Sequence, residues 1–221
     1  RIRLAQIYNK TLDPSKLADP YSEKEKKNAI SEYARMLEVK EKIGHVEIPK
    51  INQDLPIYAG TSEEVLQKGV GHLEGTSLPV GGKSTHTVLT AHRGLPTAKL
   101  FTDLNKMKKG DVFYIHNIKE VLAYKVIDVF VVEPSDFDKV LVVEGKDYCT
   151  LLTCTPYMIN SHRLLVRAER TEYNPTAVEK DLVSQVTGKY KIYLIISLII
   201  IAILLWYYIR QRRRKKNNEI K

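Results

Sequence analysis

The chain has 221 residues, enough for one sizeable hydrophobic core with appendages. It carries 35 basic and 26 acidic side chains, a net charge of +9 at pH 7, but seven of the basic residues and one acid lie in residues 210–221. That tail accounts for +6 and leaves +3 for the rest of the chain, which has no basic stripe interleaved with aromatic residues. The charge distribution therefore argues against a nucleic-acid partner.

Residues 1–42 are expected to form an N-terminal appendage. Ser22 and Glu25 have the spacing of a capping box, and an apolar stripe at helical spacing follows at Ile30, Tyr33, Ala34 and Leu37. This pattern predicts a helix over residues 22–38. Asp19-Pro20-Tyr21 lies just before it, where proline favours a turn. The first residue is Arg rather than Met, and we expect a trimmed N-terminus.

From residue 43 onward the pattern changes to short β-like runs separated by turns. The predicted strands cover residues 45–51, 55–58, 71–74, 86–92, 112–116, 121–132, 148–153 and 163–169. Helical interruptions are expected at residues 62–68 and 97–105. About eight short strands at this spacing favour a mainly β fold, a closed or nearly closed barrel with small helices, over residues 43–170.

Residues 192–209 contain no charged side chain, and Tyr190 and Lys191 extend the segment. A helix over residues 190–209 would span roughly 30 Å, the thickness of a bilayer core. The basic segment that follows predicts a cytoplasmic tail at residues 210–221 and an extracellular main domain, joined by a connector at residues 171–189. We therefore expect a cell-membrane protein in contact with lipid; the alternative is a buried helix of a soluble protein.

The two cysteines, Cys149 and Cys154, lie five residues apart in one strand-like run. In an extended chain their Cα atoms would be roughly 16 Å apart, whereas a disulfide needs about 7 Å or less. Two free thiols on an exported protein call for a reason, and catalysis is one.

Neither a cofactor nor a metal is expected. The glycines at residues 69, 71 and 75 do not fit the dinucleotide fingerprint, and the sequence has no Walker A loop, HExxH or CxxC motif. None of the six histidines forms a pair with helical i, i+4 spacing.

Nucleophilic cysteine chemistry fits the residues better. Cys154 ends a β run, and Arg163 opens the next one, so a hairpin through residues 155–162 would place a guanidinium beside the thiol. His92 ends another β run and could serve as the acid/base partner that a thiol needs. Taken singly, each has a plainer interpretation: a core cysteine, a surface histidine and a solvated arginine.

Residues 150–156 (TLLTCTP) with residues 163–169 (RLLVRAE) resemble the active-site signature of the sortases, and residues 90–94 (TAHRG) resemble the histidine segment of that family. The similarity extends over residues 43–51, 55–82 and 100–111, which carry no chemical role. It implies an eight-stranded sortase-type β-barrel in which Cys154 attacks the Thr-Gly bond of an LPXTG-like sorting signal and forms a thioester. His92 would protonate the departing amine, and Arg163 would stabilise the oxyanion.

Two features resemble the pilus-building class C sortases in particular. One is the C-terminal membrane helix, and the other is the triplet Asp19, Pro20 and Tyr21, which resembles the class C lid. In that lid the Asp contacts the catalytic Arg and the aromatic ring covers the Cys. The expected partners are therefore pilin subunits that carry LPXTG-like sorting signals and acceptor lysines. In the plainer interpretation, Asp-Pro is a helix-start turn and Tyr21 is ordinary packing.

Three other functions remain open from the sequence. A housekeeping sortase would join proteins to a cell-wall amine, and a secreted cysteine peptidase would use water as the acceptor. A non-catalytic, membrane-tethered, pilus-associated module would have lost its catalytic residues, whereas Cys154, His92 and Arg163 are all present.

Overall fold

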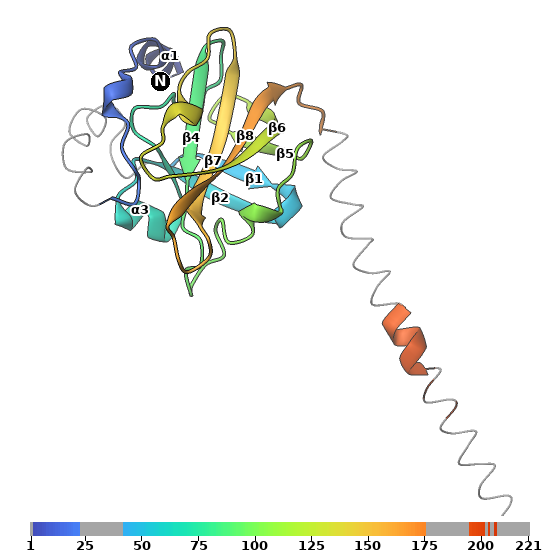
Figure 1. Ribbon diagram of the computed structural model, residues 1–221. Helices are drawn as coiled ribbons and strands as arrows, with labels where there is room; N and C mark the ends of the chain where they lie inside the picture. Colours follow the sequence, from blue (N-terminus) through green and yellow to red (C-terminus); the bar gives the residue numbers. More distant parts are fainter. Residues whose placement is uncertain (1, 23–41, 176–194, 202, 204–205, 207–221) are drawn as a thin grey trace, which may run out of the picture. The chain divides into compact units, whose positions relative to one another are not determined.

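The computed structural model describes residues 2–22, 42–175, 195–201, 203 and 206 (Figure 1). The chain divides into two units, Arg1–Tyr173 and Asn174–Lys221. All but the first residue of the helix expected over residues 22–38 lies outside the described residues, as does most of the expected connector at residues 171–189.

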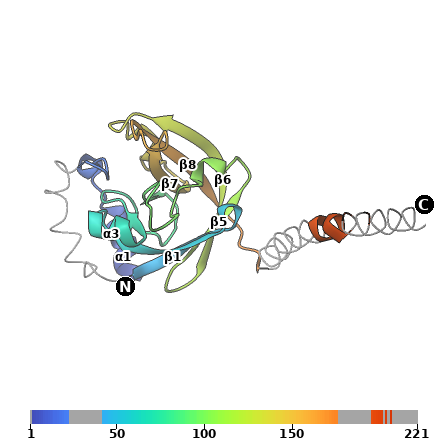
Figure 2. The same cartoon turned by 90° about the horizontal axis from the view of Figure 1, so that it is seen from below.

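The first unit is built around a closed barrel of eight strands, as the sequence predicted. The strands are β1 (Lys42–Ile48), β2 (Gln53–Ala59), β3 (Val70–His72), β4 (Thr85–Thr90), β5 (Val112–His116), β6 (Val121–Val132), β7 (Asp147–Thr155) and β8 (His162–Thr171). They follow one another around the barrel in the order β1-β2-β3-β4-β7-β8-β6-β5, and β5 closes the ring on β1. Figure 2 shows β1, β5, β6, β8 and β7 around this ring. The pairs β2–β3 and β4–β7 are parallel, whereas the other pairs are antiparallel.

The barrel interior is filled by alternate residues of its strands. Phe113 and Ile115 of β5 and Leu122 and Tyr124 of β6 are fully or almost fully buried there. Side chains alternate between the two faces of a strand, so residues two apart share the interior face. Burying each such side chain contributes roughly 1.5–3 kcal/mol relative to leaving it in water. Cys149 belongs to this core, which explains why one of the two thiols takes no part in a surface site.

A second apolar cluster covers the outer face of β4, β7 and β8. Its buried members are Leu73, Val88, Val140, Leu152 and Leu165, and the N-terminal segment packs Leu17 and Tyr21 against it. Strands β4 and β7 are therefore covered on both faces. This double burial accounts for their nearly continuous apolar and threonine-rich sequences, since a half-exposed strand would alternate apolar and polar residues.

The N-terminal segment of the first unit starts with α1 (Ile2–Lys10) and a short 3-10 turn η1 (Pro14–Lys16). The Asn9 amide donates to the Leu78 carbonyl, and its side-chain oxygen accepts from the Leu78 N–H. Ala5 and Tyr8 pack on Ala59 and Leu78. The segment is thereby fixed to the barrel before the chain reaches Asp19 (dark blue in Figure 1).

The helix expected at residues 62–68 is confirmed as α3 (Glu63–Lys68), capped by the Ser62 hydroxyl. The helix expected at residues 97–105 is wrong, because only the turn η3 (Leu104–Lys106) forms there. Leu100 has φ +38°, in the left-handed region, which interrupts any helix through it. The strand expected over residues 45–51 ends early at Ile48, since Pro49 lacks an N–H and begins the 3-10 turn η2 (Pro49–Ile51). A last turn, η4 (Asp138–Val140), precedes β7.

In the second unit, residues 195–201, 203 and 206 are helical. Within the described parts of the chain, no helix reaches the length and apolar character needed to cross a membrane. The remaining residues of the expected span at 190–209, and the whole tail at 210–221, lie outside the described residues.

Candidate active site

Cys154 and Arg163 face each other across the β7–β8 hairpin. Cys154 and Arg163 are Cα partners in this antiparallel pair, next to the end of β7 and the start of β8. The expected hairpin is therefore confirmed. Both residues are 7% exposed, so the thiol and the guanidinium share a largely covered location.

His92 reaches the same end of the barrel through a different pairing. Strand β4 runs parallel to β7, with Thr90 as the Cα partner of Leu152, and the Ala91 N–H donates to the Leu152 carbonyl. Two residues beyond this pair, the chains reach His92 and Cys154. Because neighbouring strands lie about 4.8 Å apart, this register brings the imidazole and the thiol to the same edge of the sheet.

The carboxylate of Asp19 binds the guanidinium of Arg163. Arg163 Nε donates to Asp19 Oδ1 at 2.8 Å and Nη2 donates to Oδ2 at 2.7 Å. Nη1 donates to the carbonyls of Asn160 and His162, both at 3.0 Å. Asp19 is 8% exposed, so this is a buried two-pronged ion pair, and it fills the positions at which an oxyanion could bind Arg163.

Tyr21 lies over the strand ends. Its hydroxyl donates to the Ala91 carbonyl at 2.7 Å and also bonds the Thr90 hydroxyl at 2.8 Å. The Arg163 guanidinium carbon lies 5.0 Å from the centre of the Tyr21 ring, within cation–π range. The ring centres of Tyr21 and His92 are 5.6 Å apart. Tyr21 therefore contacts the segments that carry both His92 and Arg163.

The environment keeps the Cys154 thiol protonated. Burial raises the pKa of Cys154, the carboxylate of Asp19 raises it further, and Arg163 partly opposes both effects. Burial together with the nearby Cys154 likewise raises the pKa of Tyr21, so its hydroxyl stays neutral. For Arg163, burial lowers the pKa, but the hydrogen bonds to Asp19 and the charges of Cys154, Asp19 and Tyr21 together outweigh burial and raise the pKa above its ordinary value.

Arg93, the residue after His92, is hydrogen-bonded to Thr155, the residue after Cys154. Its Nη1 donates to the Thr155 hydroxyl at 3.1 Å, and its Nε donates to the Thr102 carbonyl at 3.1 Å. The guanidinium carbon lies 5.9 Å from the centre of the Tyr157 ring. The adjacent Gly94 has φ +94°, and a Cβ there would lie 2.7 Å from the Tyr157 ring. The loops after β4 and β7 are therefore packed closely against each other.

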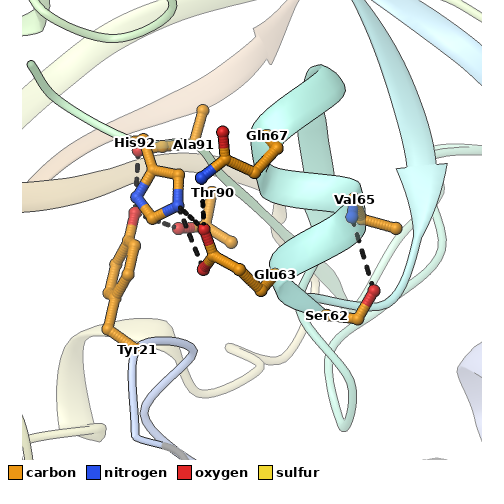
Figure 3. Close-up of polar contacts among 8 residues, drawn as sticks. All are labelled: Tyr21, Ser62, Glu63, Val65, Gln67, Thr90, Ala91 and His92. Carbon is orange, nitrogen blue, oxygen red and sulfur yellow. Dashed lines mark hydrogen bonds and ion pairs between the residues drawn. The ribbon is translucent and has the colours of Figure 1, made fainter. Parts of the chain in front are cut away.

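The imidazole of His92 pairs with Glu63. His92 Nε2 lies 3.2 and 3.3 Å from the two carboxylate oxygens of Glu63, the first residue of α3 (Figure 3). The Gln67 amide donates to the same carboxylate at 2.6 Å. Across residues 2–22 and 42–175, no hydrogen bond joins His92 to Cys154. In this structure the imidazole of His92 is therefore bonded to Glu63, and the ring of Tyr21 lies beside it.

In the described part of the chain, no group of three His, Cys, Asp or Glu side chains could hold a metal. A cavity of about 920 Å³ lies elsewhere, between α1, η1 and the start of β4. Its lining includes Leu17 but none of His92, Cys154 and Arg163.

The structure thus brings all six candidate residues to one end of the barrel: His92, Cys154, Arg163, Asp19, Pro20 and Tyr21. Sequence reasoning missed Glu63 and Arg93. Glu63 lies 29 residues before His92, at the first position of a helix. No local sequence pattern links the two residues. Arg93 adjoins His92 in the TAHRG segment, which was the available signal.

The sequence is similar to those of known proteins. Residues 46–171 match the sortase domain family. The chain is 33% identical over 135 residues to Sortase A of Bacillus anthracis, covering 60% of this chain and 61% of that protein. It is 31% identical over 114 residues to Sortase D of Bacillus subtilis, covering 52% and 54%. The chain thus spans about three-fifths or less of the length of these curated relatives.

Solved structures give higher identities. Sortase C-1 from Streptococcus pneumoniae is 65% identical with a TM-score of 0.73, and the match covers 78% of this chain and 89% of that chain. A pilus-related sortase C of Group B Streptococcus is 61% identical with a TM-score of 0.72, and the match covers 78% and 88%.

Proposed function

The chain belongs to the sortase family, and from this premise we propose that it is a cysteine transpeptidase that builds pili. It cleaves an LPXTG-like sorting signal between Thr and Gly and transfers the acyl group to a lysine amine of another pilin subunit. The observation that carries the proposal is the meeting of Cys154, Arg163 and the His92 segment at one barrel end. The similarity to pilus-related sortase C structures supports the choice of pilins as substrates.

The acylation step uses all three residues. The Cys154 thiol passes its proton to His92, and the sulfur attacks the threonine carbonyl carbon. A C–S bond forms, and Arg163 stabilises the negative charge that develops on the carbonyl oxygen. His92 then gives its proton to the glycine nitrogen, and the C–N bond breaks. A thioester remains on Cys154 and the amine departs.

The transfer step reverses these roles. A neutral lysine amine attacks the thioester carbon and gives a proton to His92. The C–S bond breaks, an isopeptide bond remains between the two pilins, and the Cys154 sulfur recovers its proton from His92. The geometry required is the same in both steps, because each passes through an oxyanion beside Arg163.

Asp19, Pro20 and Tyr21 act as a lid in this proposal. The carboxylate of Asp19 stands in for the substrate oxygen at Arg163, and Tyr21 bridges the strand ends with its ring and hydroxyl. Binding of a sorting signal at Arg163 therefore requires Asp19 to leave. Such a lid would hold the enzyme at rest until a pilin displaces it.

We place the enzyme in the cell membrane, anchored by residues 190–209 with the tail 210–221 in the cytoplasm and the barrel outside. The supports are 18 consecutive uncharged residues at 192–209 and the basic residues that follow. The described helical residues Ile195, Leu198 and Ile199 are 54–56% exposed, which favours an apolar environment around this helix.

The decisive experiment incubates the full chain in detergent micelles with one pilin that carries an LPXTG-like signal. A ladder of pilin oligomers joined by Thr–Lys isopeptide bonds, identified by mass spectrometry and absent for Cys154→Ala, is the expected result. Transfer only to an added cell-wall peptide amine would indicate a housekeeping sortase, and release of a free threonine carboxylate would indicate a peptidase. No product at all from the wild-type chain would favour a non-catalytic module.

A further inference from the structure

Glu63 is the side chain that holds the imidazole of His92. Its two carboxylate oxygens lie 3.2 and 3.3 Å from His92 Nε2, and no second hydrogen bond of that ring is recorded among the described residues. The His92 side chain is 20% exposed and the Glu63 side chain 53%, so the pair lies at the rim of the site.

The carboxylate is held in place by its own helix. Glu63 opens α3, whose first turn is capped by the Ser62 hydroxyl accepting from the Val65 N–H, at 3.4 Å (Figure 3). One turn later, Gln67 donates its amide to Glu63 Oε1 at 2.6 Å. Val65 and Leu66 are buried, which fixes the helix to the barrel. Glu63 therefore presents its carboxylate from a rigid support rather than from a free loop.

The contact determines which ring nitrogen of His92 is available for proton transfer. A carboxylate can only accept a hydrogen bond, so Nε2 must carry the proton in the neutral ring. Nδ1 then bears the lone pair. In Figure 3, Nε2 faces Glu63, and the other ring nitrogen lies on the side of Tyr21. Tyr21 is the residue that would leave when the lid opens, so Nδ1 lies on the side of the ring that an open lid would uncover.

We propose that Glu63 is a positioning residue for His92: it fixes the Nε2-protonated ring, directs Nδ1 toward Cys154 and the reacting amine, and stabilises the imidazolium formed in each step. This inference rests on the proposed transpeptidase function. Glu63 itself touches neither sulfur nor substrate in this role. Its effect belongs to the chemical steps rather than to binding of the sorting signal.

The kinetic test uses the full chain in micelles with Asp19→Ala and Tyr21→Ala, so that lid opening does not limit the rate. Glu63→Ala should lower kcat for cleavage of a sorting-signal peptide by about 10- to 30-fold with little change in KM, and Glu63→Gln by about 3- to 10-fold, the modest size reflecting an exposed pair. Glu63→Asp should recover part of the loss. Glu64→Gln is the matched control, because Glu64 is the neighbouring exposed carboxylate and pairs with Lys68.

A second measurement does not depend on turnover. Ring ¹⁵N NMR of histidine-labelled chain should show His92 with its proton on Nε2 at high pH, and Glu63→Ala should redistribute it between both nitrogens, while Glu64→Gln leaves the spectrum unchanged. An unchanged or raised kcat in Glu63→Ala, or an unchanged His92 spectrum, would overturn the proposal. If the wild-type chain processes no peptide, the proposed transpeptidase function fails, and the ring spectrum alone decides the role of Glu63.

Discussion

The carboxylate of Asp19 and the guanidinium of Arg163 form a two-pronged ion pair across 144 residues of sequence, with both bonds shorter than 2.9 Å. Both side chains are almost fully covered, so neither can leave the pair without a replacement partner or access to water. A substrate oxygen at Arg163 is such a replacement for Asp19. The ion pair therefore couples the N-terminal segment to the state of the active site.

Removing the lid contacts should activate the enzyme. We expect the double substitution Asp19→Ala and Tyr21→Ala to raise the rate of Cys154 alkylation and of sorting-signal cleavage by about 10-fold or more, because one closing contact of about 1.4 kcal/mol corresponds to a tenfold change. Alkylation with a small maleimide, followed by intact mass, measures this directly. Asp138→Asn, an exposed carboxylate of η4, should leave both rates unchanged. Equal alkylation and cleavage rates in the double variant and the wild type would contradict the role of these residues as a lid.

The same ion pair should govern the pH dependence of the thiol. Burial and Asp19 raise the pKa of Cys154 in the closed state, so less thiolate is present at a given pH. In Asp19→Asn the negative charge is gone and Arg163 remains, so the pKa of Cys154 should fall. The midpoint of the alkylation rate against pH should move to lower pH. A midpoint that stays in place or rises would contradict the electrostatic role of Asp19.

Two buried histidines should make the barrel acid-sensitive. Burial lowers the pKa of His72 from 6.5 to about 4, and burial does the same for His86. The unfolded chain then binds more protons below pH 6.5, so the free energy of unfolding should fall between pH 6.5 and 4, by up to about 3 kcal/mol for each histidine. Above pH 6.5 this contribution is fully present. Urea unfolding as a function of pH measures it.

The variant His72→Gln tests the contribution of His72 alone. His72 Nε2 lies 2.9 Å from the Ser77 carbonyl, a bond that the amide of His72→Gln can reproduce without a titrating group. The variant should therefore lose less stability on acidification than the wild type. His162→Gln, at a half-exposed position, should follow the wild-type curve. Parallel curves for His72→Gln and the wild type would show that His72 is not the group responsible.

Arg93 should support catalysis by keeping two loops in register. Arg93→Ala removes the bonds to Thr155 and Thr102, and we expect kcat to fall by about 10-fold and stability by about 1–2 kcal/mol. Arg93→Lys should recover little, since an ammonium group cannot reproduce a planar fork over Tyr157. Steady-state kinetics and thermal unfolding measure the two effects. Lys99 is an exposed cation of the same loop, and Lys99→Ala should change neither kcat nor thermal stability.

Much of this architecture could be predicted from sequence, where the deciding interactions are local. The β7–β8 hairpin follows from two β runs joined by a short loop, and it places Cys154 opposite Arg163. The start of α3 follows from the Ser62 cap. The expected pairing of Asp19 with Arg163 is present, although that expectation came from a family resemblance rather than from the residues themselves.

The interactions that sequence reasoning missed are long-range or depend on backbone conformation. No sequence pattern near Glu63 indicates its contact with His92, because the contact arises from the packing of α3 on the barrel. The helix expected at residues 97–105 failed at Leu100, whose left-handed backbone overrides the apolar pattern around it. The cavity beside α1 could not be predicted either, since its lining comes from four separate stretches of chain.

The parallel alignment of β4 with β7 determines which changes in chain length this site can tolerate. The spacing of imidazole and sulfur is determined by backbone hydrogen bonds such as Ala91 to Leu152, and not by the length of any loop. Segments beyond His92 and Cys154 are not held by this register, so they can vary without changing the spacing of the two groups. A one-residue insertion within either strand would turn one of the two groups to the opposite face of the sheet and abolish the chemistry.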